Sequence, residues 1–183
     1  VVPSVTFVAT ANALRYVGAE VIFADVDADS GLMTADHLEQ ALSRSGNRNV
    51  RAVLPVHLAG QCFDPAAIVR VAHEHGLTVI EDGAHSLGTL YGADDAQVAV
   101  GACRHSDMAT FSFHPVKTVA MGEGGAITTE NDELAERLRC LRSHGMARHP
   151  DQFVNSKMAR TADGRNNPWY YEVSELGFNY RAS

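Results

Sequence analysis

Short apolar strands alternate with helical segments along most of this chain, and the alternation restricts the folds that it can adopt. We expect strands at residues 1–3, 20–24, 50–56, 77–80 and 107–113. We expect helices at residues 6–18, after Thr34 as N-cap, and at residues 65–75 and 131–145. This order predicts an α/β fold of three layers, α/β/α, in which helices cover both faces of a mainly parallel sheet.

Two segments depart from this order. Residues 125–129 also read as a strand, but they follow Lys117 after a short turn, whereas a parallel crossover needs a dozen or more residues. We therefore expect this strand to run antiparallel to its neighbour. Residues 146–172 carry no steady apolar period, so we interpret them as a long surface excursion that ends in Trp169, Tyr170 and Tyr171.

Composition excludes several classes of function. The 183 residues carry a net charge of −7 and contain no run of Lys and Arg, which argues against nucleic acid as a partner. No apolar run approaches the length needed to cross a membrane, and we expect no signal peptide. The chain has three cysteines, Cys62, Cys103 and Cys140, an odd number with no C-x-x-C motif, which fits free thiols and a cytoplasmic location.

The sequence predicts no metal site. His73 and His75 are two residues apart on a helix, so they point to different faces. Cys103 and His105 lack the second pair of ligands that a zinc site would need.

Lys117 is the first candidate for chemistry. The chain has thirteen arginines but only two lysines, Lys117 and Lys157. Because this chain mostly uses arginine as its surface cation, a lysine in apolar surroundings suggests a specific role. A partly desolvated lysine amine can lose its proton and attack a carbonyl, which a guanidinium cannot do. Ser112 precedes it and could bind an anion, and the glycines at 122, 124 and 125 permit close backbone approach. The alternative is a surface lysine on a loop.

Asp82 is the second candidate. It ends the apolar strand at residues 77–80, and ligands of open α/β sheets bind outside the carboxyl ends of strands. His85, three residues later, could hold an oxygen beside a cationic nitrogen held by Asp82. The alternative, a carboxylate that only caps the following turn, remains open for Asp82 alone.

The pair of Asp82 and Lys117, each after its own strand, is the stronger pattern. Pyridoxal 5'-phosphate needs such a pair: a lysine for the Schiff base and an acid for the pyridinium nitrogen. A nucleotide-binding α/β protein would instead need a G-x-G-x-x-G motif after its first strand, and the sequence has none.

Several ordered motifs resemble one known family over nearly the whole chain. They are the stretches at residues 3–12, 81–88, 111–117, 122–125 and 177–181. In this order and spacing the chain resembles the DegT/DnrJ/EryC1/StrS sugar-nucleotide aminotransferases, which are fold-type-I pyridoxal phosphate enzymes. The resemblance implies that residues 1–183 are a partial large, cofactor-binding domain, with an N-terminal segment and a C-terminal small domain absent.

The same resemblance implies roles for individual residues. Lys117 would form the Schiff base and then act as general base, and Asp82 would keep the ring nitrogen protonated. Phe7 would stack on the ring. The remaining cofactor contacts would be His85 to the phenolic oxygen, Ser112 to the phosphate, and Asn179 to the phosphate bound by the neighbouring subunit of a homodimer.

The implied reaction moves an amino group from glutamate to a nucleotide-linked 4-keto-6-deoxy sugar. Residues 141–145, 168–172 and 175–181 resemble most the branch of UDP-4-amino-4,6-dideoxy-N-acetyl-β-L-altrosamine transaminases of pseudaminic acid biosynthesis. An aromatic cluster beside a basic segment suits a sugar or uracil face and a diphosphate, although Trp169 and Tyr170 could instead only pin the loop.

Three alternatives remain open. The substrate could be another nucleotide sugar, such as a dTDP-4-keto-6-deoxy sugar. The enzyme could be a cofactor-dependent sugar dehydratase, although Lys117 argues against this since such relatives carry histidine there. The chain could also be a non-catalytic sensor or structural relative, against which the set of Asp82, Ser112 and Lys117 argues.

Overall fold

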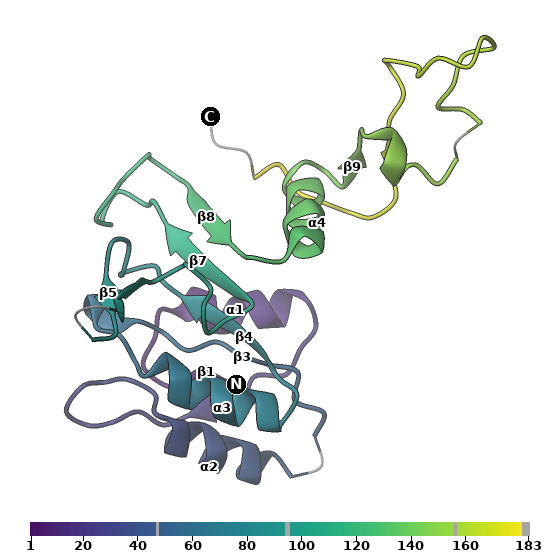
Figure 1. The fold of residues 1–183 in the computed structure, drawn as a ribbon. Coiled ribbons are helices and arrows are strands. Elements are labelled where there is room, and N and C mark those ends of the chain that lie inside the picture. Colours follow the sequence, from purple (N-terminus) through teal and green to yellow (C-terminus); the bar gives the residue numbers. More distant parts are fainter. Residues whose placement is uncertain (47, 94–95, 156, 181–183) are drawn as a thin grey trace. The chain divides into compact units, whose positions relative to one another are not determined.

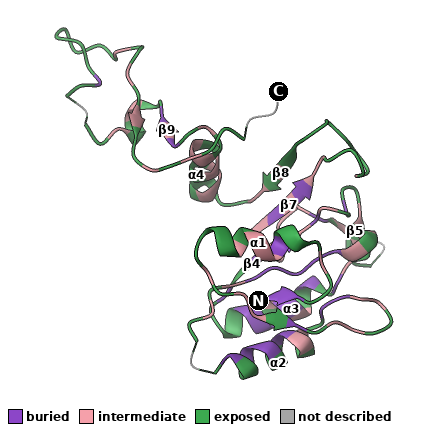
Figure 2. Cartoon of the chain, turned by 180° about the vertical axis from the view of Figure 1, so that it is seen from behind, coloured by how far each residue is buried: buried purple, intermediate pink, exposed green. Residues whose placement is uncertain are grey.

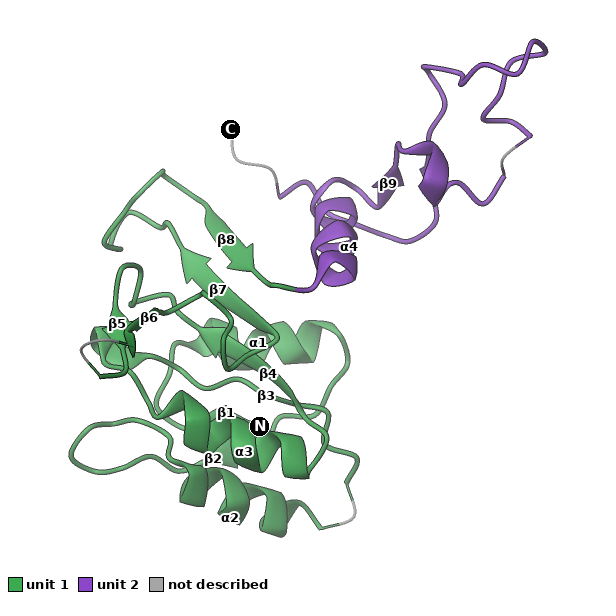
Figure 3. Ribbon diagram, viewed as in Figure 1, with its two compact units in different colours: residues 1–130 green, residues 131–183 purple. Residues whose placement is uncertain are grey.

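The computed structural model describes residues 1–46, 48–93, 96–155 and 157–180. The chain divides into two compact units, Val1–Glu130 and Asn131–Ser183 (Figure 3), and each is considered by itself.

A four-stranded sheet forms the centre of the first unit (Figure 1). Its order is β3 (Ala52–Val53), β4 (Thr78–Asp82), β7 (Met108–Ser112) and β8 (Gly125–Thr128). The β3–β4 and β4–β7 pairs are parallel and the β7–β8 pair is antiparallel, so the expected exception at residues 125–129 is confirmed. Asp82 is the register partner of Thr110, which places the last residue of β4 beside the end of β7.

Two further parallel strands extend this sheet. β1 (Val2–Pro3) pairs with β2 (Phe23–Ala24). The nitrogen of Val1 donates to the carbonyl of Ala52 at 2.6 Å, and its carbonyl accepts from Leu54 at 2.9 Å, which joins this pair to β3. The sheet therefore continues as β2–β1–β3–β4–β7–β8. A separate antiparallel pair, β5 (Leu90–Tyr91) with β6 (Val98–Ala99), lies in the less regular stretch before β7.

Several strands are shorter than their apolar runs suggest. The run at 50–56 forms only two strand residues, because Pro55 has no N–H to donate. Its carbonyl still accepts from Asp82 N at 2.9 Å, and His57 N donates to Asp82 O at 3.1 Å, so the pairing continues irregularly to the end of β4.

Helices α2 (Ala35–Ser45) and α3 (Pro65–Glu74) cover one face of the sheet, and α1 (Val8–Tyr16) lies on the other, as comparison of Figures 1 and 2 shows. Side chains of Thr34 and Asp64 cap the first turns of α2 and α3, which confirms the predicted cap at Thr34. The main core lies on this face and includes the apolar residues Leu38, Ala41, Leu42, Val53, Ile68, Val71, Ala72 and Val79.

Helix α1 differs from the other two helices. Apolar spacing predicts a core face made of Val8, Ala11, Ala13 and Leu14. Ala11 and Leu14 are half-buried, but Val8 is 60% exposed, and the one buried residue of the helix is Thr10. Figure 2 shows most of α1 as exposed or half-buried. The one buried side chain of the helix thus makes a polar contact, which is described below.

The hairpin of β7 and β8 explains one of the glycines beyond Lys117. A Cβ atom built on Gly125 would lie 2.6 Å from the backbone oxygen of Phe111 in the neighbouring strand, closer than real side chains come. Gly122 has φ of +78°, a conformation that glycine adopts at low cost. The expectation that this cluster permits close approach and positive φ is confirmed at these two positions.

The second unit contains α4 (Asp132–Arg142), capped by Asn131, and an antiparallel pair of β9 (Met146–Ala147) and β10 (Glu172–Val173). Leucines at 134, 138 and 141 follow helical spacing, which predicts a buried stripe, but they are only half-buried. Backbone bonds from His144 to Phe178, Phe178 to Leu141 and Tyr180 to Arg142 hold residues 178–180 beside the end of α4. Residues 146–172 therefore form an excursion whose two ends are fixed side by side.

Candidate active site

Asp82 is held from several sides at the end of β4. Its backbone bonds to Pro55 and His57 on one side and is in register with Thr110 on the other. Its Oδ2 accepts a hydrogen bond from the Thr10 hydroxyl at 2.8 Å, and its Oδ1 accepts from the Ala84 N–H at 3.1 Å. One donor on each oxygen fixes the plane of the carboxylate. A carboxylate offers about four acceptor positions, so lone pairs remain for a ligand.

Strand alternation separates Asp82 from the carboxylate before it. Glu81 is 1% exposed, and its Oε2 lies 3.3 Å from Nε2 of His57, which is fully buried and stacks on Phe63 with ring centroids 4.2 Å apart. Asp82 is half-buried on the opposite face, toward α1. His57 is therefore a core histidine. The role of Asp82 in binding a ligand stays a prediction.

The charge of Glu81 acts on its neighbours. Burial first, and the Glu81 carboxylate second, raise the pKa of Tyr91 to about 12, and the same two causes raise the pKa of the Cys62 thiol. Both groups are therefore neutral at pH 7. The expected free thiols at Cys62, Cys103 and Cys140 are confirmed.

His85 follows Asp82 on a tight turn and is exposed. Its Nδ1 accepts the N–H of Ala59 at 3.3 Å, from the 3₁₀ turn Leu58–Gly60, where Ala59 itself has φ of +54°. An imidazole nitrogen that accepts carries no proton, so the neutral ring has its hydrogen on Nε2. His85 can therefore donate one hydrogen bond to an oxygen beyond the strand end.

Ser112 and Lys117 come from the neighbouring strand β7 and the turn after it. The Ser112 Oγ accepts from the His114 N–H at 3.3 Å, which leaves its own hydrogen free to donate to an anion. Lys117 is half-buried, and its backbone N–H bonds to the His114 carbonyl at 2.9 Å. Among the described residues, none forms an ion pair or a side-chain hydrogen bond with Lys117.

Phe7 stands directly before α1 and is 72% exposed. It lies three residues before Thr10, whose hydroxyl holds Asp82, so the same contact that fixes the carboxylate also ties down the segment that carries this aromatic ring. An exposed phenylalanine at the start of a helix that is bonded to a carboxylate is available to stack on a planar ring.

Asn179 lies in the second unit, where it forms an antiparallel bridge with Ser143. The five other predicted residues, Phe7, Asp82, His85, Ser112 and Lys117, all belong to the first unit. The role of Asn179 in a neighbouring subunit stays a prediction.

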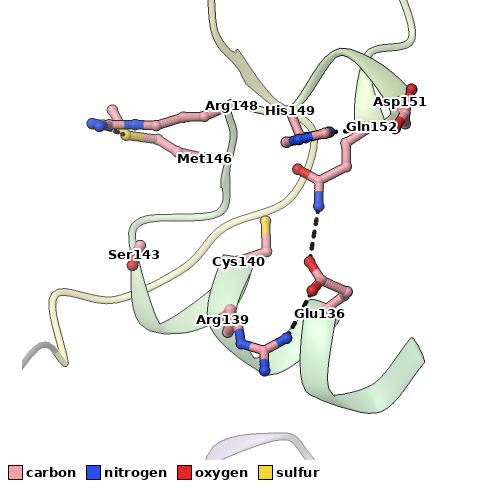
Figure 4. A pocket seen from close by; sticks show the side chains of 9 residues that line it. All are labelled: Glu136, Arg139, Cys140, Ser143, Met146, Arg148, His149, Asp151 and Gln152. Carbon is pink, nitrogen blue, oxygen red and sulfur yellow. Dashed lines mark hydrogen bonds and ion pairs between the residues drawn. The ribbon is translucent and has the colours of Figure 1, made fainter. Parts of the chain in front are cut away.

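A cavity of about 700 Å³ lies elsewhere, in the second unit between α4 and the segment after β9 (Figure 4). Its charged side chains are largely paired with one another, as Glu136 with Arg139 at 2.7 Å and His149 with Asp151 at 3.3 Å. None of the predicted site residues lines it. We therefore place the candidate active site at the strand ends and not in this cavity.

The described part of the chain holds no cluster of His, Cys, Asp and Glu that could bind a metal ion. Within the same residues, no helix has both the length and the apolar character needed to span a membrane.

Sequence reasoning missed two features of this site. Thr10 was missed because an apolar pattern cannot detect a buried hydroxyl and because its partner, Asp82, is 72 positions away in the sequence. The His57–Glu81 pair was missed because the two residues are separated by 24 positions and no local pattern joins them.

The α/β fold agrees with that of the fold-type-I enzymes that use pyridoxal phosphate. The sequence pattern of the DegT/DnrJ/EryC1/StrS aminotransferase family matches residues 1–183. The chain therefore belongs to this family, whose aminotransferases depend on pyridoxal phosphate.

Individual relatives agree with the family. The chain is 39% identical over 173 residues to the spore coat polysaccharide biosynthesis protein SpsC of Bacillus subtilis (strain 168), over 94% of this chain and 40% of that protein. It is similar to Helicobacter pylori PseC, an aminotransferase involved in pseudoaminic acid biosynthesis (TM-score 0.76, 27% identity, 98% of this chain and 41% of that one). It is also similar to DesI in the presence of its TDP-sugar product (TM-score 0.68, 38% identity, 79% and 34%). The chain thus spans about 40% of the length of such relatives.

The residues of this chain fit pyridoxal phosphate. Asp82 offers free lone pairs to a ring N–H, His85 offers a donor to a ring oxygen, and Ser112 offers a donor to a phosphate. Phe7 presents an open aromatic face, and Lys117 presents an amine that no described residue engages.

The buried pair of His57 and Glu81 generates a stability prediction. Replacing Glu81 by Leu leaves the buried imidazole without its acceptor, so we expect a loss of about 3 kcal/mol of unfolding free energy. The double variant His57→Leu/Glu81→Leu should lose clearly less than the sum of the single variants, because it leaves no unpaired polar group behind. Denaturant unfolding measures all three.

Glu74→Leu is the matched control for this cycle. Glu74 forms an exposed ion pair with Arg70 at 3.7 Å, so its loss should change stability by no more than about 0.5 kcal/mol. Strictly additive costs of the His57 and Glu81 substitutions would show that the two side chains do not act as a pair.

Proposed function

We propose that this chain carries the cofactor-binding part of a pyridoxal-phosphate-dependent aminotransferase. The enzyme moves an amino group from glutamate to a nucleotide-linked 4-keto-6-deoxy sugar. The observation that carries the proposal is the fixed carboxylate of Asp82 at the end of β4, with Lys117 on the turn after the neighbouring strand β7. Membership of the family supports it.

Lys117 would hold the cofactor covalently through its Nζ. Pyridoxal phosphate supplies an electron sink when bound, which stabilises negative charge that develops on the amino donor. Released by the incoming amino group, the Lys117 amine would take the proton from the α-carbon of glutamate. Water would supply the oxygen of the departing 2-oxoglutarate, and the amino group would stay with the cofactor. In the second half of the reaction the same amine would return a proton as the nitrogen passes to the keto carbon of the sugar, whose oxygen leaves as water.

The other residues bind and orient. Asp82 would keep the ring nitrogen protonated, so that the ring can accept charge. His85 would donate from Nε2 to the phenolic oxygen, Ser112 would donate to the phosphate, and Phe7 would stack on the ring. The presence of Lys117 in place of histidine disfavours the dehydratase alternative, and the complete set of polar groups disfavours a non-catalytic relative.

For the sugar, we propose the UDP-linked N-acetylated 4-keto-6-deoxy hexosamine of pseudaminic acid biosynthesis. The similarity to PseC supports this choice. Trp169 is 86% exposed and is available to a sugar or base, whereas Tyr170 donates to Glu172 at 2.8 Å and packs edge-on against Phe153, so it pins the loop. The similarity to DesI keeps the dTDP-linked sugar as the second candidate.

We also propose a homodimer in which Asn179 binds the cofactor phosphate of the neighbouring subunit. The extent to which residues 1–183 form one partial cofactor domain, and the cytoplasmic location expected from the free cysteines, stay predictions of the sequence.

Lys117 is tested by chemical trapping. Borohydride reduction of the intact protein with bound cofactor should fix the cofactor to Lys117, as peptide mass spectrometry would detect. Lys117→Ala should lower turnover by about 10²–10⁴-fold or more, and Asp82→Asn by about a hundredfold, because each removes a group that acts on the reacting atoms. Lys157, the other lysine of the chain, provides the control: Lys157→Ala should retain activity and labelling. Label on Lys157, or no label, would contradict the proposal.

The substrate is tested by comparing two sugars in separate assays. The intact enzyme is offered the UDP-linked N-acetylated 4-keto sugar or dTDP-4-keto-6-deoxyglucose, each with glutamate, and kcat/KM is measured for both. We expect preference for the UDP sugar. A clear preference for the dTDP sugar would overturn the pathway but leave the aminotransferase assignment standing.

The shared site is tested by mixing two inactive variants. In a heterodimer of Lys117→Ala and Asn179→Ala chains, one site would combine an intact Lys117 with an intact Asn179 from the other chain. We expect the purified heterodimer to recover about half of the native activity, since one of two sites is complete. If Asn179 served its own subunit, no site would be complete and activity would be about half that of the Asn179→Ala homodimer, since only one of the two sites would keep Lys117.

A further inference from the structure

Thr10 is the only residue of α1 that is buried, with 7% of its surface exposed. Large apolar side chains of the same helix, such as Val8 and Tyr16, are exposed. A buried hydroxyl costs free energy unless it is hydrogen-bonded. Thr10 meets this requirement through the carboxylate of Asp82, and this contact ties the helix to the end of β4.

The direction of the hydrogen bonds follows from the chemistry of the groups. Thr10 Oγ1 lies 2.8 Å from Asp82 Oδ2, and it must donate because an ionised carboxylate only accepts. Thr6 Oγ1 lies 2.8 Å from Thr10 Oγ1, and it donates in turn because the Thr10 hydrogen is already used. The result is a chain of hydroxyls from Thr6 to Thr10 to Asp82, in which each bond polarises the next.

The geometry suits orientation of the carboxylate. A threonine side chain in a helix occupies few χ1 states, so the Thr10 hydroxyl points in a restricted direction. It engages Oδ2 while the Ala84 N–H engages Oδ1. Together they prevent rotation about the last side-chain bond of Asp82 and leave the remaining lone pairs in fixed directions.

We infer that Thr10 is a positioning residue that orients Asp82 toward the ring nitrogen of the cofactor, and that Thr6 orients Thr10. This inference rests on the proposed function, since it assigns a task to the carboxylate. The inference goes beyond the proposed function because neither threonine touches the cofactor in the proposed arrangement. The same bond ties Phe7, at the start of α1, to the carboxylate, so ring stacking and ring-nitrogen binding are adjusted together.

The test measures cofactor binding and the spectrum of the bound cofactor in the intact protein. Thr10→Val keeps the shape of the side chain but removes the hydroxyl, and we expect the Kd for pyridoxal phosphate to rise about tenfold, as for loss of a hydrogen bond to a charged group. Thr10→Ser keeps the hydroxyl and should stay within about twofold of the native Kd. Thr6→Val should show a smaller rise, about threefold, because Thr10 keeps its own donor.

The pH titration of the visible cofactor band gives a second readout. A ring nitrogen held less firmly in its protonated form withdraws less electron density from the nitrogen that joins the cofactor to Lys117. We therefore expect the midpoint of the titration to move to higher pH in Thr10→Val and to stay unchanged in Thr10→Ser. A residue that only anchored the helix would lower stability without moving this midpoint.

Ser45→Ala is the matched control. Ser45 is as buried as Thr10, but its hydroxyl donates to the Leu42 carbonyl within α2, so its loss should change neither the Kd nor the midpoint. A Thr10→Val protein with the native Kd and midpoint, or a Thr10→Ser protein as impaired as Thr10→Val, would overturn the inference. Should Thr10→Val fail to fold, Thr6→Val decides: a native Kd in that variant rejects the hydroxyl chain. Native protein that binds no cofactor would reject the proposed function, and the inference with it.

Discussion

The arrangement of the first unit depends on how firmly one residue, Asp82, is held. Its backbone is bonded to the irregular end of the β3 segment, its register partner lies in β7, and its carboxylate is bonded to α1. These contacts bring together three parts of the chain that are far apart in sequence. A ligand that binds Asp82 therefore meets a group whose position was fixed when the sheet formed, and little ordering remains to be done on binding.

Adjacent carboxylates on β4 have opposite consequences. Glu81 faces the core, where its burial with His57 is costly and is offset only by the geometry of the pair. Asp82 faces α1, where two donors stabilise it and lone pairs remain available. One strand thus provides a structural and a ligand-binding carboxylate in consecutive positions, because successive side chains point to opposite faces.

Much of this fold could be predicted from local patterns, and the failures have physical causes. The antiparallel course of β8 followed from chain length alone, and the Thr34 cap followed from residue type. The side of α1 that is buried could not be read from apolar spacing, because a hydroxyl and a carboxylate make the decisive contact. Strand ends were misjudged where Pro55 interrupts pairing.

The candidate site was predictable to the same degree. Asp82 and Lys117 stand out in the sequence because binding pyridoxal phosphate needs an acid and a lysine near strand ends. In the structure Asp82 ends β4, and Lys117 follows the neighbouring strand β7. Other contacts join distant segments of the chain. Thr10 bonds to Asp82, Ala59 bonds to His85, and His57 pairs with Glu81, the residue before Asp82. Such contacts leave no periodic trace in a single sequence.

The pairing of residues 178–180 with the end of α4 has a consequence for how this chain can diversify. Because the two ends of the 146–172 excursion are fixed side by side, the stretch between them closes a loop whose entropic cost depends only weakly on its length, about 0.6 kcal/mol for each doubling. Insertions and deletions between β9 and β10, within residues 148–171, leave the pairing that fixes the two ends intact. The sequence and length of this loop can therefore vary, in evolution or by engineering, while the strand-end residues of the first unit stay unchanged.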